Sequence, residues 1–218
     1  MCQTAALTRA GPKPLELADV LTRFANKLAP LRASLTRVVH DIITCRTEAL
    51  GGHIQQCDRC GHLDAFFNSC RNRHCPKCQS LSQARWLEAR QQDLLPVEYF
   101  HIVFTIPAVL HRIFRGDPKT AYSILFAAVS ETLREVAINP KRLGARIGFT
   151  AVLHTWTQTL LYHPHIHCVV PGGGLSLDRT RWVGCKPGYF LPVKKVLSKV
   201  FRGKLLDKLE KALNKNAI

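Results

Sequence analysis

The chain has 218 residues, of which 46% are hydrophobic, so it is long enough to bury one core or two small ones. Its 31 lysines and arginines outnumber 15 acidic residues and give a net charge of +16, which favours a polyanionic partner, with nucleic acid as the leading class. No run approaches the roughly 18 consecutive apolar residues of a membrane span, and the N-terminus lacks a signal-peptide pattern. We therefore expect a cytoplasmic protein with no membrane partner.

Two amphipathic helices are predicted between Leu15 and Leu50, with a break at Pro30. Apolar residues recur there at intervals of three and four, which is the period of one helix face. These helices are expected to be scaffold or docking elements, because they carry no catalytic pattern.

The segment CDRCGHLDAFFNSCRNRHCPKCQ contains two C-x-x-C pairs, Cys57 with Cys60 and Cys75 with Cys78. Fourteen residues separate the pairs, which is close to the spacing of four-cysteine zinc ribbons. A reducing cytosol favours metal binding over disulfides. We therefore predict a structural zinc ion bound by these four thiolates. Four neighbouring residues are further candidates that could replace one of them: Cys70, His53, His62 and His74.

Basic residues surround these cysteines, and a helix is predicted from Ser80 to Leu94. A small basic unit stabilised by zinc is typical of DNA-binding domains. The candidate DNA-binding residues are Arg59, Arg71, Arg73, Lys77 and Arg85. The alternative is a zinc ion that only stabilises a small subdomain, with the basic residues simply solvated.

The remainder of the chain predicts an α+β fold. YFHIVFTIP predicts a strand from Tyr99, KTAYSILFAAVSETLREVA a long helix, and RIGFTAVLHTWTQ and HPHIHCVVPG two further strands. This order indicates an antiparallel sheet packed with helices. We expect a helical, zinc-binding and DNA-binding domain over residues 1–95 and a second domain over residues 96–218.

Histidines occupy alternate positions in YHPHIHCVVPGGG, at His163, His165 and His167. Side chains alternate across a strand, so His165 and His167 are expected on one face, where they could bind a divalent metal ion, with His163 on the same side. The alternative is a half-exposed strand whose histidines have no ligand. The glycines at 172–174 predict a sharp turn that leaves the strand end open to a bulky ligand.

The zinc block, the strand YFHIVFTIP and the block HPHIHCVVPGGGLS together closely resemble the rolling-circle transposases of the insertion sequence 91 family, which belong to the HUH endonuclease class. The resemblance implies a partial HUH-type sheet in which His165 and His167 are catalytic and hold Mg²⁺ or Mn²⁺. It also implies that the metal acts on single-stranded transposon ends, where a tyrosine attacks the scissile phosphate in a transesterification.

The chain departs from the family in one respect. The family's nucleophilic tyrosine lies on a helix well downstream of the histidine strand, whereas this chain ends at Ile218 in a basic segment that is either a DNA-contacting helix or an unfolded end. The four tyrosines present, at positions 99, 122, 162 and 189, are outside that context. We therefore expect a C-terminally truncated transposase without its catalytic tyrosine, and the third metal ligand is not identified.

Two other functions fit the same residues. The first is a non-catalytic zinc-ribbon protein that binds DNA, for example as a regulator. The second is a metallohydrolase in which His163, His165 and His167 hold a catalytic zinc ion.

Overall fold

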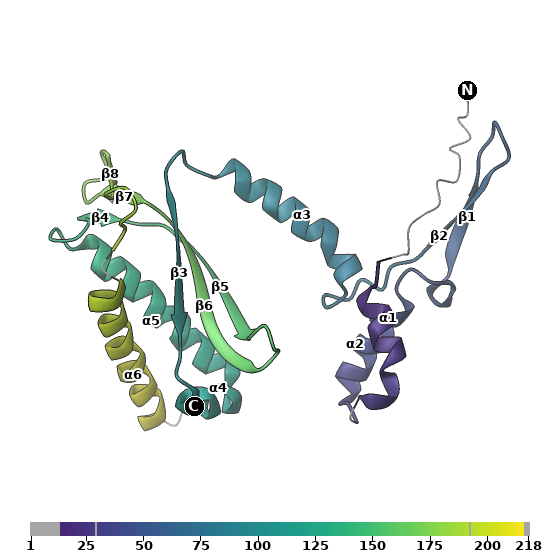
Figure 1. Ribbon diagram of the computed structural model, residues 1–218, viewed down its shortest axis with the longest axis horizontal. Helices are drawn as coiled ribbons and strands as arrows, with labels where there is room; N and C mark the ends of the chain where they lie inside the picture. Colours follow the sequence, from purple (N-terminus) through teal and green to yellow (C-terminus); the bar gives the residue numbers. More distant parts are fainter. Residues whose placement is uncertain (1–13, 29, 192, 216–218) are drawn as a thin grey trace. The chain divides into compact units, whose positions relative to one another are not determined.

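The computed structural model describes residues 14–28, 30–191 and 193–215. The chain divides into two compact units, Met1–Leu94 and Leu95–Ile218, which are described separately (Figure 1). Within the described residues, no helix has the length and apolar character needed to cross a membrane.

The first unit contains three α-helices and a β-hairpin. Helices α1 (Leu17–Arg23) and α2 (Ala33–Thr44) lie on either side of Pro30, as predicted. Strands β1 (Gly52–Gln56) and β2 (Leu63–Phe67) pair antiparallel, and α3 (Pro76–Gln92) follows. The buried core of this unit is small. It consists, within the described residues, of Ile42, Cys45 and Cys75, with a few partly buried neighbours.

The second unit is built on two antiparallel three-stranded sheets. One sheet has the order β3-β6-β5 and the other the order β4-β7-β8. The strands are β3 (Tyr99–Thr105), β4 (Ala145–Arg146), β5 (Thr150–Trp156), β6 (Tyr162–Pro171), β7 (Gly173–Ser176) and β8 (Trp182–Gly184). The helices are α4 (His111–Gly116), α5 (Pro118–Ile138) and α6 (Ser198–Asn214). These elements confirm the predicted α+β fold class.

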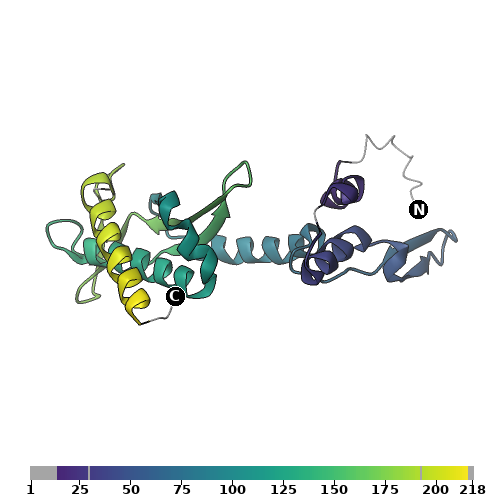
Figure 2. The ribbon, with the colours of Figure 1, turned by 90° about the horizontal axis from the view of Figure 1, so that it is seen from below.

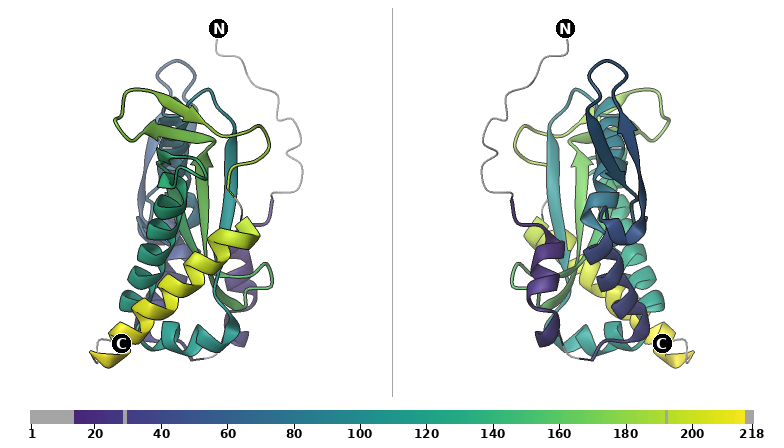
Figure 3. Two further views of the ribbon diagram at one scale, coloured as in Figure 1. Left: turned by 90° about the vertical axis from the view of Figure 1, so that its left-hand side faces the viewer. Right: turned by 90° about the vertical axis from the view of Figure 1, so that its right-hand side faces the viewer.

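One face of the β3-β6-β5 sheet packs against α5 and α6, as the end-on views show (Figures 2 and 3). Strand alternation places Ile166, Cys168 and Val170 on this face, where all three are fully buried. The core joins them to residues from β3 and the helices. The histidines of β6 therefore lie on the opposite face, which α5 and α6 do not cover.

The C-terminal basic segment is a folded helix rather than an unfolded end. Helix α6 buries Phe201, Leu205 and Leu209 in the core of the second unit. The amino groups of Lys204 and Lys208 each lie 2.7 Å from a carboxylate oxygen of α5, on Glu135 and Glu131 respectively. This helix is thus held by both its apolar and its charged residues.

The glycine run after β6 has a different role from the predicted one. A Cβ atom on Gly174 would lie 2.3 Å from the carbonyl oxygen of Arg146, and one on Gly172 would lie 2.9 Å from that of Glu98. Glycine is required because neighbouring backbone approaches this closely. The end of β6 is therefore packed against other backbone and is not open to a bulky ligand.

Candidate metal centres

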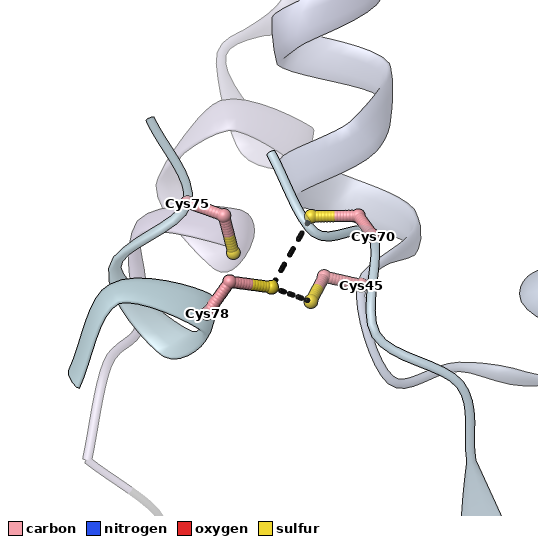
Figure 4. Close-up of side chains that lie close together, drawn as sticks. All are labelled: Cys45, Cys70, Cys75 and Cys78. Carbon is pink, nitrogen blue, oxygen red and sulfur yellow. Dashed lines mark hydrogen bonds between the residues drawn. The ribbon is translucent and has the colours of Figure 1, made fainter. Parts of the chain in front are cut away.

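Four cysteines of the first unit point toward one another (Figure 4). Their Sγ atoms all lie within 4.8 Å of each other, and Cys78 Sγ is 3.5 Å from Cys45 Sγ and 3.6 Å from Cys70 Sγ. Sulfurs bound about 2.3 Å from one tetrahedral zinc ion lie about 3.8 Å apart, so the cluster fits zinc. It consists of Cys45, Cys70, Cys75 and Cys78.

The local structure explains why these four thiols meet. Cys45 is the C-cap of α2, and Cys75 is the N-cap of α3. The residues that follow Cys45 and Cys70 have left-handed backbone, with φ of 60° at Arg46 and 54° at Arg71. Such φ values are uncommon outside glycine and persist where surrounding structure holds them, often at binding sites.

The thiols of the cluster already differ in their acidity. Burial acts to raise the pKa of Cys78, but hydrogen bonds from the thiols of Cys45 and Cys70 outweigh it and lower that pKa to about 7. Burial raises the pKa of Cys70 to about 12. Zinc is bound by thiolates. The neighbouring thiols therefore favour the thiolate form of Cys78, which is the form that binds zinc.

This cluster differs from the four ligands predicted from the sequence. Cys75 and Cys78 belong to it, but Cys45 and Cys70 take the places that were assigned to Cys57 and Cys60. Cys57 and Cys60 lie instead in the turn of the β1-β2 hairpin, where the Cys57 amide donates to the His62 carbonyl oxygen at 2.8 Å. A C-x-x-C motif in a hairpin turn and one at the start of a helix look alike in sequence. Only the tertiary structure shows which of them reaches the other cysteines.

The second cluster lies on the open face of the β3-β6-β5 sheet. His165 and His167 alternate along β6, and His154 lies directly across from His165 on β5. Each of the three side chains offers a ring nitrogen within 4.8 Å of those of the other two. The predicted pair thus lies together, and His154 joins it as a third candidate ligand.

Hydrogen bonds leave one nitrogen of each β6 histidine available. His165 Nδ1 donates to the backbone carbonyl oxygen of His163 at 2.6 Å, which directs its Nε2 outward. His167 Nδ1 lies 2.7 Å from His101 Nε2, and His167 Nε2 is buried with no hydrogen-bond partner. A buried polar atom without a partner is costly, and a metal ion would satisfy it. The residues therefore fit a divalent ion.

His163, the third residue of the alternating pattern, is not in this cluster. Its ring lies beside those of His165 and His111, with centroids 5.3 Å and 5.9 Å apart, and its carbonyl oxygen accepts the hydrogen bond from His165, but its ring nitrogens are not among those that meet in the cluster. Simple hairpin pairing in the sequence could not have found His154, because the β5-β6 register shifts between His154 and Trp156: Trp156 lies opposite Tyr162, whereas His154 lies opposite His165.

Three of the four tyrosine hydroxyls form hydrogen bonds, and the fourth tyrosine, Tyr189, is exposed. Those of Tyr122 and Tyr162 lie 3.0 Å apart, and the hydroxyl of Tyr99 accepts a hydrogen bond from the Leu95 amide. Burial and the neighbouring Tyr122 hydroxyl raise the pKa of Tyr162 well above its usual value, so its reactive phenolate is disfavoured. Tyr189 is exposed and lines a pocket of about 300 Å³ with Lys141 and Lys186.

Four of the five candidate DNA-binding residues are exposed. Arg59 lies in the turn of the β1-β2 hairpin, Arg71 and Arg73 precede α3, and Arg85 lies on α3. Lys77 is different, because its amino group is paired with Glu16 at 2.5 Å and is only partly exposed. The four arginines are thus exposed to solvent, although Arg73 Nε also donates to His74 Nε2 at 3.3 Å.

Comparison with known proteins gives two family matches. Residues 17–106 match the family described as "Transposase zinc-binding domain", and residues 148–218 match the family described as "Putative transposase". The first match spans the cysteine cluster and supports a structural zinc ion in this unit. The second spans all three residues of the histidine cluster.

Two curated transposases are similar over much of the chain. The protein named "Putative transposase y4qJ" of Sinorhizobium fredii (strain NBRC 101917 / NGR234) is 52% identical over 95% of this chain and 52% of its own length. The transposase for insertion sequence element IS801 of Pseudomonas savastanoi pv. phaseolicola is 31% identical over 67% of this chain and 35% of its own length. The chain therefore spans about half the length of the first relative and about a third of the second.

Among solved structures, the metal-bound conjugative relaxase TrwC in complex with oriT DNA resembles the chain with a TM-score of 0.40 and 18% identity, covering 51% of this chain and 42% of that one. The pair of family matches and the sequence identity to the two curated proteins show that this chain belongs to the insertion sequence 91 family of transposases.

Proposed function

We propose that this chain binds DNA and positions a divalent metal ion for the nicking reaction of a rolling-circle transposase. The observation that carries the proposal is the cluster of His154, His165 and His167 on the open sheet face, with the buried Nε2 of His167 unpartnered. A bound Mg²⁺ or Mn²⁺ ion would polarise the phosphoryl oxygen of the scissile phosphodiester. The ion is thus assigned a catalytic role, in contrast to the structural zinc of the first unit.

The charge of the site favours a phosphodiester as its substrate. Three neutral imidazoles leave the positive charge of a divalent ion uncompensated, and the strands β3, β5 and β6 contain no Asp or Glu. An anionic ligand such as a DNA phosphate supplies the missing negative charge. A zinc hydrolase would typically place a carboxylate general base beside its metal-bound water, and these three strands offer none.

The metal ligands do not identify the group that attacks the phosphate. In the family the attacking group is a tyrosine, and the hydroxyls of Tyr122 and Tyr162 are occupied with each other. We assign none of the four tyrosines to this role. The part of the reaction proposed for this chain is to bind the single strand and to hold its phosphate, and the tyrosine comes from elsewhere.

For the first unit, the proposal assigns zinc to Cys45, Cys70, Cys75 and Cys78 and DNA contacts to the exposed arginines around them. Phosphate neutralisation by these arginines is sequence-independent and sensitive to salt. Lys77 is expected to contribute less than Arg85, because Glu16 already neutralises it. The comparison of Lys77→Ala with Arg85→Ala therefore tests the electrostatic part of the proposal.

The experiment measures binding of a fluorescent single-stranded transposon end by anisotropy, with and without Mn²⁺. The wild-type chain should bind more tightly when Mn²⁺ is present, because the ion bridges protein and phosphate. The double variant His165→Ala/His167→Ala should keep its metal-independent binding and lose the Mn²⁺ effect. His163→Ala, on the same sheet face but outside the cluster, is the matched control and should behave as wild type. A Mn²⁺ effect that survives the double variant would refute the proposal.

The same preparation can test the assignment of the tyrosines. With Mn²⁺ and labelled single strand, a denaturing gel should show no covalent protein–DNA adduct from this chain alone. An adduct that disappears in Tyr189→Phe or Tyr162→Phe would show that a resident tyrosine is the nucleophile and would contradict the assignment.

A further inference from the structure

His101 on β3 lies outside the three-residue histidine cluster but contacts one of its members, His167. Its Nε2 is 2.7 Å from His167 Nδ1, and the two rings are nearly coplanar, with an interplanar angle of 7° and centroids 5.0 Å apart. A nitrogen–nitrogen contact this short between coplanar rings is a hydrogen bond in the ring plane, where N–H groups and lone pairs point. In the sheet, His101 reaches His167 diagonally, because the residue directly opposite His167 is Val103.

This hydrogen bond determines which nitrogen of His167 can bind a metal ion. A neutral imidazole carries one N–H, so His167 can offer a lone pair on Nε2 only if its proton is on Nδ1. That proton must then be donated to His101, whose Nε2 must accept it. His101 in turn must carry its own proton on Nδ1.

The two β6 ligands reach the metal-binding tautomer by different means. His165 donates to a backbone carbonyl oxygen, which can only accept, so its tautomer is fixed by the strand itself. His167 has a partner that can accept or donate. If His101 donated, the proton of His167 would lie on Nε2 and would block the metal. The direction of the hydrogen bond between His101 and His167 therefore decides whether His167 can bind a metal ion.

We propose that His101 is a positioning residue that holds His167 in its metal-binding tautomer and ring orientation by accepting the Nδ1 proton. The proposal rests on the proposed function, since it requires a divalent ion at the histidine cluster. Loss of such a partner typically lowers metal affinity about 10- to 100-fold. His101 itself need not touch the metal or the DNA.

Three substitutions of His101 separate acceptance from other roles. His101→Phe keeps a planar ring and removes the acceptor, His101→Gln supplies an amide oxygen that can accept, and His101→Lys supplies only a donor. Mn²⁺ affinity is measured on the zinc-loaded chain by electron paramagnetic resonance of the free ion. We expect the Phe and Lys variants to lose about 10- to 100-fold in affinity and the Gln variant to recover most of it. His163→Phe, a ring replacement on the same face, should bind Mn²⁺ as wild type does.

A second readout follows the tautomer itself. Ring nitrogen-15 shifts of histidine-labelled protein distinguish protonation at Nδ1 from protonation at Nε2. Without metal, His167 should be protonated mainly at Nδ1 in the wild-type chain and in His101→Gln, and it should be a mixture of the two tautomers in His101→Phe. Saturating Mg²⁺ should move the proton to Nδ1 in every variant that binds the ion. A purely structural role of His101 would not move these shifts.

The outcomes separate this inference from the proposed function. If wild-type chain binds Mn²⁺, His165→Ala abolishes that binding and His101→Phe leaves it unchanged, the inference is overturned and the proposed function stands. Equal loss in the Gln and Lys variants would also overturn the inference, because acceptance would not be what matters. If wild-type chain binds no Mn²⁺, or if His165→Ala binds it normally, both are overturned.

Discussion

The two candidate metal centres belong to very different surroundings. In the first unit the described buried core is Ile42 and two of the four clustered cysteines, so the metal-binding residues largely are the core. Among the described residues of the second unit, the core contains twenty buried residues on one face of the sheet, and the histidines lie on the other face. A small unit without a sufficient core typically needs a metal ion or disulfides to fold, whereas a well-packed sheet does not. Zinc thus takes the place of a core in the first unit, whereas the ion proposed for the histidine cluster is not needed to hold the second unit together.

The largest effect is expected from breaking the cysteine cluster. Cys75→Ser should unfold the first unit, because structural zinc contributes about 10–16 kcal/mol in small zinc domains. Zinc content by mass spectrometry and circular dichroism would measure the loss. Cys57→Ser is the matched control, because Cys57 lies in the hairpin turn outside the cluster, and it should keep the zinc. If Cys57→Ser lost as much zinc as Cys75→Ser, Cys57 would be a zinc ligand, as predicted from the sequence.

A substitution in the core of the second unit should destabilise that unit and leave the first unit unchanged. Leu125 is fully buried between the sheet and the helices, so Leu125→Ala should destabilise the second unit by about 2–5 kcal/mol. Zinc content and the fold of the first unit should not change. Denaturant unfolding monitored separately in each unit would test this. If both units lost stability together, the comparison between them would fail.

The stability of the second unit should depend on pH through His167. Burial, with the nearby His154, His165 and His101, lowers the pKa of His167 below its usual value of about 6.5. Between that lowered value and about 6.5 the unfolded chain binds a proton that the folded chain does not, so stability falls as pH falls through this window. Above it, this penalty is absent. Urea unfolding without metal at pH 8 and pH 5.5 should show a smaller pH effect for His167→Gln than for wild type, and an identical effect would contradict the buried, neutral His167.

The smallest effect is expected at the charged contact between α5 and α6. Glu131 accepts from Lys208 at 2.7 Å and lies 3.7 Å from Lys204, but these side chains are partly exposed. Exposed ion pairs typically contribute about 0–1 kcal/mol. Glu131→Gln should therefore lower the stability of the second unit by less than about 1 kcal/mol, in a salt-dependent way. A loss as large as that of Leu125→Ala would show that the pair, and not the apolar face of α6, holds this helix.

Local patterns in the sequence predicted most of the fold. The three-and-four spacing of apolar residues gave the helices around Pro30, and aromatic and β-branched runs gave β3, β5 and β6. The predicted pair His165 and His167 lies together because alternation along one strand is a local property. These predictions needed no knowledge of which segments meet in space.

The complete ligand sets could not be predicted in the same way. Cys45 and Cys70 come together only because the end of α2 packs beside the loop after β2, and no spacing rule specifies that. His154 joins the second cluster through the pairing of β5 with β6. The hydrogen bond of His101 likewise depends on a diagonal contact between β3 and β6. Each of these residues is placed by tertiary structure and not by its neighbours in sequence.

Hydrogen exchange measured by mass spectrometry, before and after a chelator removes all metal, is the most direct test of the central difference between the two units. We predict that peptides of residues 14–94 lose their protection when zinc is removed, while peptides of β3, β5, β6 and α5 keep theirs. Equal loss of protection in both units, or none in the first, would contradict the conclusion that only the cysteine site is structural.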